Sequence, residues 1–195
     1  MLFYILFWIV TFIFLLRIRC KFFLVLEIGF GMGETTAAIA RTNPEWNILA
    51  VDVYRPGVGA LLRRIEQESL SNIRIVEWDA VEVLDHMIMR ASLDAVHIYF
   101  PDPWPKKRHH KRRLIQQAFV ELLVEKLSHG GILHLATDWP EYADQMLAAC
   151  SSVPQLQNLA GAGFSPRPPW RPQTKFESRG LRLGHPVADL IFQKK

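Results

Sequence analysis

One segment of the chain decides its fold: Leu24-Val25-Leu26-Glu27-Ile28-Gly29-Phe30-Gly31-Met32-Gly33. Its apolar half predicts a buried strand, and a helix is predicted to follow at 34–41. Gly29, Gly31 and Gly33 permit a tight turn and let a ligand approach the backbone closely. A strand, a glycine-rich turn and a helix in this order predict the first unit of an α/β sheet, with a cofactor pocket at the turn.

Strand and helix patterns alternate from residue 22 onward. Strands are predicted at 23–28, 47–51, 73–77, 95–100 and 132–136, and helices at 34–41, 58–69, 80–89, 112–127 and 141–150. The proline-rich stretch 165–172 is predicted to be a loop, and 187–192 a final strand. Five strand–helix units, an irregular segment and a terminal strand predict a doubly wound, mostly parallel sheet with an antiparallel C-terminal strand.

The composition fits one domain with a sizeable hydrophobic core and an unevenly charged surface. The chain has 195 residues and a formal net charge of +4. Basic side chains concentrate in 106–113 and again in 167–182, which favours a polyanionic partner. Cys20 and Cys150 are the only cysteines, so we predict no disulfide framework, no metal site and a reducing compartment.

The first 21 residues form an apolar segment distinct from the domain at 22–195. Met1 to Leu16 contains no charged residue, and Arg17, Arg19 and Lys21 follow. The run is short for a membrane span and lacks the features of a secretory signal. Three interpretations stay open: a membrane anchor with its basic flank in the cytoplasm, a helix packed on the domain, or a wrongly assigned start of the reading frame. Membrane contact is expected only through this segment.

Three carboxylates are predicted at or near the ends of the first three strands: Glu27, Asp52 and Asp79. Ligands of open α/β sheets bind at these ends. Asp52 can accept both ribose hydroxyls of an adenosine, while Asp79 can accept an adenine amino group or cap a helix. Glu27 suits a cationic ligand, and Glu34 disfavours the pyrophosphate of NAD. With the glycine spacing, this set resembles S-adenosylmethionine-dependent methyltransferases of the Rossmann-like class I.

A carboxylate, an indole and a basic run follow the fourth predicted strand: Pro101-Asp102-Pro103-Trp104-Pro105-Lys106-Lys107-Arg108-His109-His110-Lys111-Arg112-Arg113. Three prolines stiffen this corner, and the cations suit phosphates. Cations at a helix N-terminus oppose the macrodipole, so a purely structural role explains the run poorly. Trp104 is expected either to stack on a base or to pack at the pocket wall.

This string resembles the bacterial tRNA (guanine-N7)-methyltransferase family. The resemblance extends from about residue 24 to the C-terminus and includes Asp79–Leu84, Ala136-Thr137-Asp138-Trp139 and Thr174-Lys175-Phe176-Glu177-x-Arg179-Gly180. It implies a cytoplasmic enzyme that methylates N7 of a guanine in the variable loop of tRNA, with S-adenosyl-L-methionine as cofactor and tRNA as partner. A monomer is expected, with a homodimer as the alternative.

The resemblance also implies roles for individual residues. Cofactor contacts are expected at Glu27, Asp52, Asp79 and Asp102, in addition to the three glycines. Asp102 is also expected to be catalytic, because its charge can steady a cationic guanine. Substrate contacts are expected at Lys106, Asp138, Thr174, Lys175, Phe176 and Glu177, and at the RNA-facing residues Arg108, His109, His110, Lys111, Arg112 and Arg113.

Two departures from the family pattern keep other functions open. The family commonly has Glu in place of Asp52, and a polar, basic lead-in in place of the apolar segment at 1–21. The alternatives are a methyltransferase acting on a small molecule or another RNA site, and a catalytically impaired RNA-binding module. An NAD oxidoreductase is disfavoured by Glu34.

Overall fold

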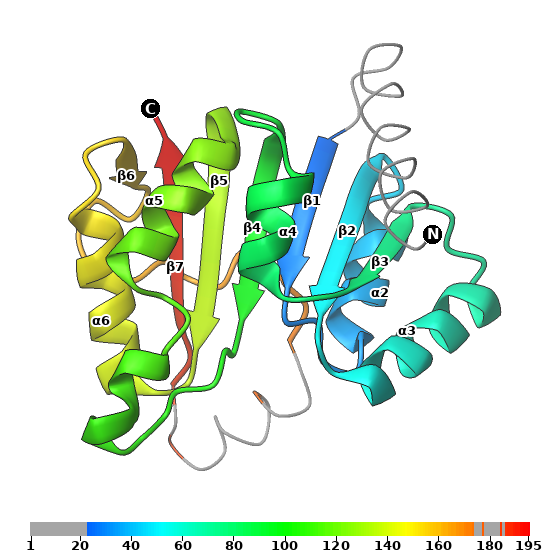
Figure 1. Ribbon diagram of the computed structural model, residues 1–195, viewed down its shortest axis with the longest axis horizontal. Helices are drawn as coiled ribbons and strands as arrows, with labels where there is room; N and C mark the ends of the chain where they lie inside the picture. The colour runs from blue at the N-terminus through cyan, green and yellow to red at the C-terminus, as the bar shows by residue number, and fades with distance from the viewer. Residues whose placement is uncertain (1–22, 174–176, 178–183, 185) are drawn as a thin grey trace.

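A computed structural model describes residues 23–173, 177, 184 and 186–195. Its centre is a seven-stranded sheet with the order β3-β2-β1-β4-β5-β7-β6 (Figure 1). The first five strands run parallel, and β7 is antiparallel to both β5 and β6, which confirms the predicted fold class. The strands are β1 Phe23–Ile28, β2 Trp46–Asp52, β3 Ile73–Glu77, β4 Leu93–Tyr99, β5 Leu127–Thr137, β6 Leu156–Asn158 and β7 Ala188–Lys194.

Helices cover both faces of this sheet. In Figure 1, α4, α5 and α6 lie in front of it, while α2 and α3 pack on the opposite face. The carboxyl ends of β1, β2, β4 and β5 point toward the lower edge of that view, where ligands of such sheets bind. The helices are α2 Glu34–Thr42, α3 Arg55–Gln67, α4 Ala80–Met87, α5 Gln117–Lys126 and α6 Pro140–Ser151, with a short 3₁₀ helix, η1, at Lys107–Arg112.

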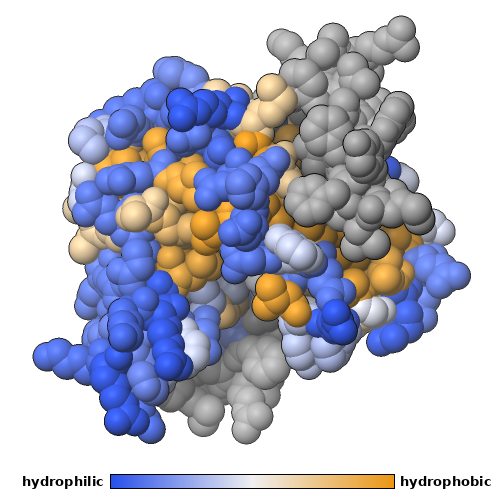
Figure 2. Space-filling view, viewed as in Figure 1, coloured by the Kyte–Doolittle hydropathy of each residue, from blue (hydrophilic) through white to orange (hydrophobic). Residues whose placement is uncertain are grey.

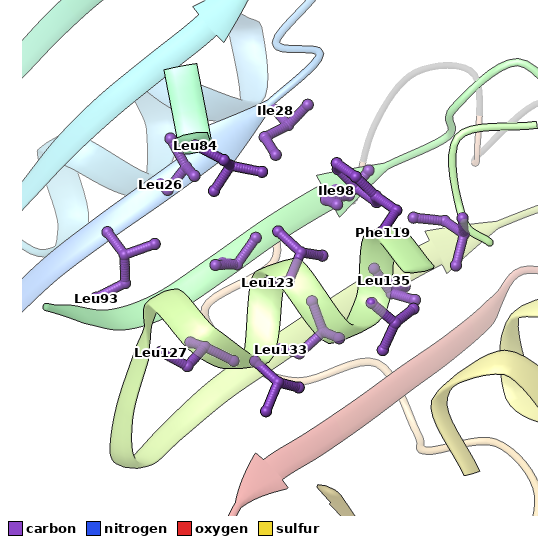
Figure 3. Packing of buried hydrophobic residues seen from close by; sticks show 14 of the residues in the cluster. Leu26, Ile28, Leu84, Leu93, Ile98, Phe119, Leu123, Leu127, Leu133 and Leu135 are labelled. Carbon is purple, nitrogen blue, oxygen red and sulfur yellow. The ribbon is translucent and has the colours of Figure 1, made fainter. Parts of the chain in front are cut away.

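Alternation along the strands assigns side chains to the two faces. Leu26 and Ile28 of β1 and Leu133 of β5 pack with Leu123 of α5 and Leu84 of α4 in one fully buried cluster (Figure 3). Removing a buried leucine of this kind by substitution with alanine costs about 2–5 kcal/mol. This packing fixes the strands against one another and holds their carboxyl ends in place.

The structure corrects the predicted helix at 112–127. The chain passes through η1, takes an extended conformation at Gln116, and forms α5 only from Gln117 to Lys126. Strand β5 then begins at Leu127, which pairs with Leu93, and continues through Gly130-Gly131. A Cβ on Gly131 would lie 2.8 Å from the Ser128 carbonyl oxygen, so the glycine permits a close backbone approach inside the strand. The three-residue strand β6 was not predicted.

Within the described residues, no helix is both long and apolar enough to cross a membrane. The apolar segment at 1–21, with its three interpretations, lies outside these residues.

Candidate functional site

The glycine-rich turn after β1 is held by the end of β2. Gly29 N–H donates to the Val51 carbonyl (2.8 Å), and Gly31 N–H donates to the Asp52 carboxylate (2.8 Å). Gly29, Gly31 and Gly33 all have positive φ (78°, 55° and 71°), which side chains rarely adopt. Asp52 therefore fixes the turn directly, in addition to its predicted role toward a ribose.

Helix α3 approaches the same turn through a glycine that the sequence analysis missed. A Cβ on Gly57 would lie only 1.9 Å from the Gly31 carbonyl oxygen. Tyr54 N–H donates to the other Asp52 oxygen (3.0 Å), so the start of α3 and the turn share one carboxylate. The Pro56-Gly57-Val58-Gly59 sequence at a helix start was the available signal.

Glu27 lies buried at the base of this turn with an exposed fraction of 3%. Burial raises its pKa to about 7, and the nearby Asp52 charge adds to the rise. Among the described residues, neither Glu27 Oε2 nor Thr36 Oγ1 has a hydrogen-bond partner. A buried carboxylate oxygen without a donor is costly, so this position favours a ligand that brings a donor or a positive charge.

Asp79 follows β3 and caps α4. Its Oδ1 accepts hydrogen bonds from Val81 N–H (2.8 Å) and Glu82 N–H (3.2 Å), so the capping alternative is present. Trp78 beside it is 53% exposed, and Val81 is exposed as well. Exposed apolar side chains at a strand end suit a flat ring. Trp78 is a candidate that the sequence analysis missed, although an aromatic residue between a strand and a helix cap was visible.

The corner after β4 is compact and strained. Asp102 Oδ1 accepts from Trp104 N–H (3.0 Å), which closes a turn over Pro103. Phe100 and Trp104 have positive φ (52° and 43°), an unusual conformation for residues with side chains. Such strain collects at functional sites. The Asp102 side chain is exposed at the carboxyl edge of the sheet.

The Trp104 indole packs within the basic segment. The Arg112 guanidinium lies 5.0 Å from the ring centroid, and the His109 ring meets the indole edge-on at 5.8 Å. The indole thus contacts two side chains of the basic segment, and the two roles expected for Trp104, stacking on a base or packing at a pocket wall, stay predictions.

The basic segment itself is the 3₁₀ helix η1, not the start of an α-helix. Its long cationic side chains are exposed, and hydrophilic residues gather over this part of the molecule at the lower left of Figure 2. The exposed cations are Lys106, Lys107, Arg108, Lys111 and Arg112.

Arg113 departs from the expected RNA-facing group because it is buried, with an exposed fraction of 2%. Its Nε donates to the Pro103 carbonyl (2.8 Å), and one terminal nitrogen donates to Gln145 Oε1 (2.6 Å). The guanidinium also lies over the Tyr142 ring and donates to His110 Nε2 (3.0 Å). Arg113 thus fastens the Asp102 corner to α6 and presents no free charge to a phosphate.

The remaining predicted substrate residues fall at the same edge or outside the described residues. Asp138 is exposed directly after β5, the neighbour of β4. Glu177 is buried and pairs with Arg171 through both oxygens (2.7 and 2.9 Å). Thr174, Lys175 and Phe176 lie outside the described residues. The Arg171 pair was missed by sequence reasoning, which had placed Arg171 in a basic surface stretch.

Comparison with known families and curated proteins gives a consistent result. Residues 21–190 match the model of a family described as "Putative methyltransferase". Proteins named tRNA (guanine-N(7)-)-methyltransferase are 58% identical over 170 residues in Nitrosospira multiformis, 60% over 172 in Verminephrobacter eiseniae and 59% over 170 in Neisseria meningitidis. These alignments cover 87–88% of this chain, which spans 62–74% of the length of these relatives.

Solved structures share the fold at low sequence identity. An rRNA methylase from Streptococcus thermophilus superposes with a TM-score of 0.60 at 19% identity, covering 89% of this chain and 87% of its own. "A putative methyltransferase from streptococcus mutans in complex with SAH" gives 0.59 at 13% identity, covering 88% of each chain. The architecture is therefore that of Rossmann-like methyltransferases.

Proposed function

The chain belongs to the tRNA (guanine-N7)-methyltransferase family, and we propose that it transfers a methyl group from S-adenosyl-L-methionine to N7 of a guanine in tRNA. The observation that carries the proposal is the Asp102 corner. It places an exposed carboxylate at the carboxyl edge of the sheet, after the strand β4 that lies next to β1 and its glycine-rich turn, and directly before the exposed cations at 106–112. A methyl donor, a cationic product and a polyanionic substrate each find a matching group there.

The residues around the glycine-rich turn and at the ends of β2 and β3 fit the cofactor. Glu27 offers a buried oxygen without a donor among the described residues, which suits the positively charged end of this ligand. The Asp52 carboxylate at the end of β2 is proposed to accept the ribose hydroxyls, and the exposed Trp78 beside Asp79 offers a surface for an adenine ring. When bound, the cofactor supplies a methyl group on a sulfonium sulfur, which keeps the electron pair of the breaking C–S bond.

The chain's own contribution is positioning and charge. Guanine N7 carries a free lone pair at neutral pH, so no residue is needed as a general base. Formation of the N7–C bond leaves a positive charge on the ring, and the Asp102 carboxylate can stabilise it while accepting guanine N–H groups. Asp138 and Glu177 are proposed to contact the same base. Asp138 directly follows β5, and Glu177 pairs with Arg171.

The exposed cations of η1 are proposed to hold the tRNA backbone. Four such side chains lie in η1 and the exposed Lys106 directly precedes it, which is enough to neutralise several phosphates. We also propose position 46 of the tRNA, in its variable loop, as the target, and the cytoplasm as the place of action. The relatives' shared name supports the guanine N7 specificity.

Two binding and transfer measurements test the proposal. Calorimetry should show binding of S-adenosylmethionine and none of NAD. Incubation with methyl-labelled cofactor and unmodified tRNA should then place the label on 7-methylguanosine. Label on another nucleoside would favour a different RNA site, while tRNA binding without transfer would favour a catalytically impaired RNA-binding module.

A further inference from the structure

A cluster of buried polar side chains lies on the face of the sheet opposite α4, α5 and α6. Asp189 of β7 and His134 of β5 point to this face, and the proline-rich segment covers them with Trp170 and Arg171. Three of these side chains are almost inaccessible: Arg171 and Asp189 are each 1% exposed, and His134 is 0% exposed. None of them belongs to the family motifs that the sequence displays.

Arg171 makes two bidentate pairs at once. Its Nε and Nη2 donate to the two oxygens of Asp189 (2.7 and 2.8 Å), and its Nη1 and Nη2 donate to the two oxygens of Glu177 (2.7 and 2.9 Å). Burial opposes the charge, but the hydrogen bonds with Glu177 and Asp189 outweigh it and raise the pKa of Arg171. Because the planar guanidinium is hydrogen-bonded along two of its edges, it fixes the plane of the Glu177 carboxylate, which a lysine cannot do.

His134 orients the Asp189 carboxylate of this cluster. Trp170 Nε1–H can only donate, and it lies 3.2 Å from His134 Nδ1, so Nδ1 is the acceptor. The ring proton therefore sits on Nε2, which donates to Asp189 Oδ1 at 2.7 Å. Burial lowers the pKa of His134 in spite of the neighbouring Asp189, so the ring is a neutral donor.

The Arg171 guanidinium also lies near Phe100, the residue at which the Asp102 corner begins. Arg171 Cζ lies 5.8 Å from the centroid of the Phe100 ring. Phe100 has positive φ and precedes Pro101-Asp102 directly. One buried cation thus contacts both Glu177 and the residue from which the corner begins.

We propose that Arg171 is a positioning residue for methyl transfer: braced by Asp189 and His134, it holds the Glu177 carboxylate in a fixed place relative to Asp102. This inference rests on the proposed function, in which Glu177 contacts the guanine. A buried ion cluster contributes little net stability compared with apolar residues of the same volume, so stability alone explains Arg171 poorly. Orientation of a carboxylate at a reacting base is a reason to keep the charge.

The test compares Arg171→Lys, Glu177→Gln and the double variant with the parent protein. Single-turnover rates are measured with saturating cofactor and tRNA, alongside the affinity for S-adenosylmethionine, the KM for tRNA and the melting temperature. Arg90→Lys is the matched control, because Arg90 pairs with Glu125 (3.0 Å) on the surface, in the loop before β4. Asp189→Asn replaces Arg171→Lys if that variant melts below the assay temperature.

Arg171→Lys should lower the single-turnover rate about 100-fold, the scale of loss from a small misplacement of a reacting group. Cofactor affinity and the KM for tRNA should stay within about threefold of the parent values, since uniform binding is not affected. In the Glu177→Gln background, Arg171→Lys should lower the rate no further, because the two residues act as one unit.

The outcomes separate this inference from the function on which it rests. A folded Arg171→Lys variant with the parent rate, or losses that multiply in the double variant, would overturn the positioning role and leave the function intact. Full activity of Glu177→Gln would overturn the guanine contact of Glu177. Absence of methyl transfer by the parent protein would overturn the proposed function itself.

Discussion

At β1 and β2 the candidate site residues come from neighbouring segments and are held by hydrogen bonds to backbone N–H groups, whereas at β4, β5 and β7 they come from segments farther apart in the sequence and are held by contacts between side chains in addition to strand pairing. Gly31 and Asp52 are 21 positions apart, and the Gly31 N–H donates to the Asp52 carboxylate. His134 and Asp189 are 55 positions apart, on strands β5 and β7 that pair through their backbones, and their side chains meet in a buried hydrogen bond. The first region is proposed to hold the cofactor, and the second to hold the guanine and the tRNA.

This difference has a consequence for substitutions. Changes near the glycine turn should alter cofactor affinity and leave the chemistry of bound complexes nearly intact. Changes near the Asp102 corner should alter turnover or tRNA binding and leave cofactor affinity intact.

The largest effect is expected for Asp102→Asn. The variant keeps the turn and the hydrogen bond from Trp104 N–H but removes the charge, so the single-turnover rate should fall about 10²–10³-fold. Cofactor affinity, measured by calorimetry, should change little. Asp85→Asn on the exposed face of α4 is the control. The rate is measured in a complex saturated with cofactor and tRNA. A rate within about twofold of the parent rate would show that Asp102 takes no part in the chemistry.

A smaller loss is expected for Asp52→Ala, and it should appear in cofactor binding. The substitution leaves ribose hydroxyls unpaired and frees the Gly31 and Tyr54 N–H groups, so the free energy of cofactor binding should become less favourable by about 1–3 kcal/mol. Isothermal calorimetry gives the value directly. Unchanged affinity would show that the cofactor lies elsewhere on the sheet edge.

Neutralising Lys106, Arg108, Lys111 and Arg112 to glutamine should act on tRNA alone. Each lost phosphate contact should flatten the log–log salt dependence of tRNA binding by about 0.7–0.9 units. Arg113 is left out because it is buried beneath the corner. Arg63→Gln on the exposed face of α3 is the control. A salt slope equal to that of the parent protein would mean that η1 is a solvated turn without RNA contacts.

The smallest effect concerns the pH dependence of stability through Glu27. Its folded pKa of about 7 exceeds the usual value of 4.5, so its contribution to stability is fully present below pH 4.5 and is lost as the pH rises through about 7. The melting temperature of Glu27→Gln minus that of the parent should therefore grow by about 2–4 °C between pH 6 and 8. His97 and His134, whose pKa values are lowered by burial, shift both proteins alike and cancel in the difference.

A pH-independent difference in melting temperature would show that Glu27 is already ionised at pH 6. Thermal melts followed by circular dichroism at four or more pH values distinguish the two results.

The sequence predicted the parts of the molecule that depend on local pattern. Strand β1 and the turn at Gly29, Gly31 and Gly33 were predicted with their observed bounds, because apolar runs and glycines act locally. The start of α5 was misplaced because Arg113 bonds to the Pro103 carbonyl and to Gln145 and lies over the Tyr142 ring, and these contacts hold η1 apart from the helix.

Side-chain roles that depend on distant partners were not predicted. Arg113 and Arg171 look like surface cations in the sequence, and only the folded chain shows Gln145 beside one and Asp189 beside the other. No periodicity or spacing relates residues 32 or 18 positions apart across different elements. The same limit applies to Gly57. A side chain at this position would collide with the Gly31 carbonyl, which belongs to another loop.

The central claim is that the carboxyl edge of this sheet directs a methyl group to N7 of one guanine. The most direct test gives the protein two unmodified transcripts of one tRNA, with guanine or adenine at position 46, and methyl-labelled S-adenosylmethionine. Nucleoside analysis by mass spectrometry then identifies the product. The account predicts 7-methylguanosine from the guanine transcript and no label in the adenine transcript or with Asp102→Asn. Equal 7-methylguanosine in both transcripts, or label on any other nucleoside, would contradict it.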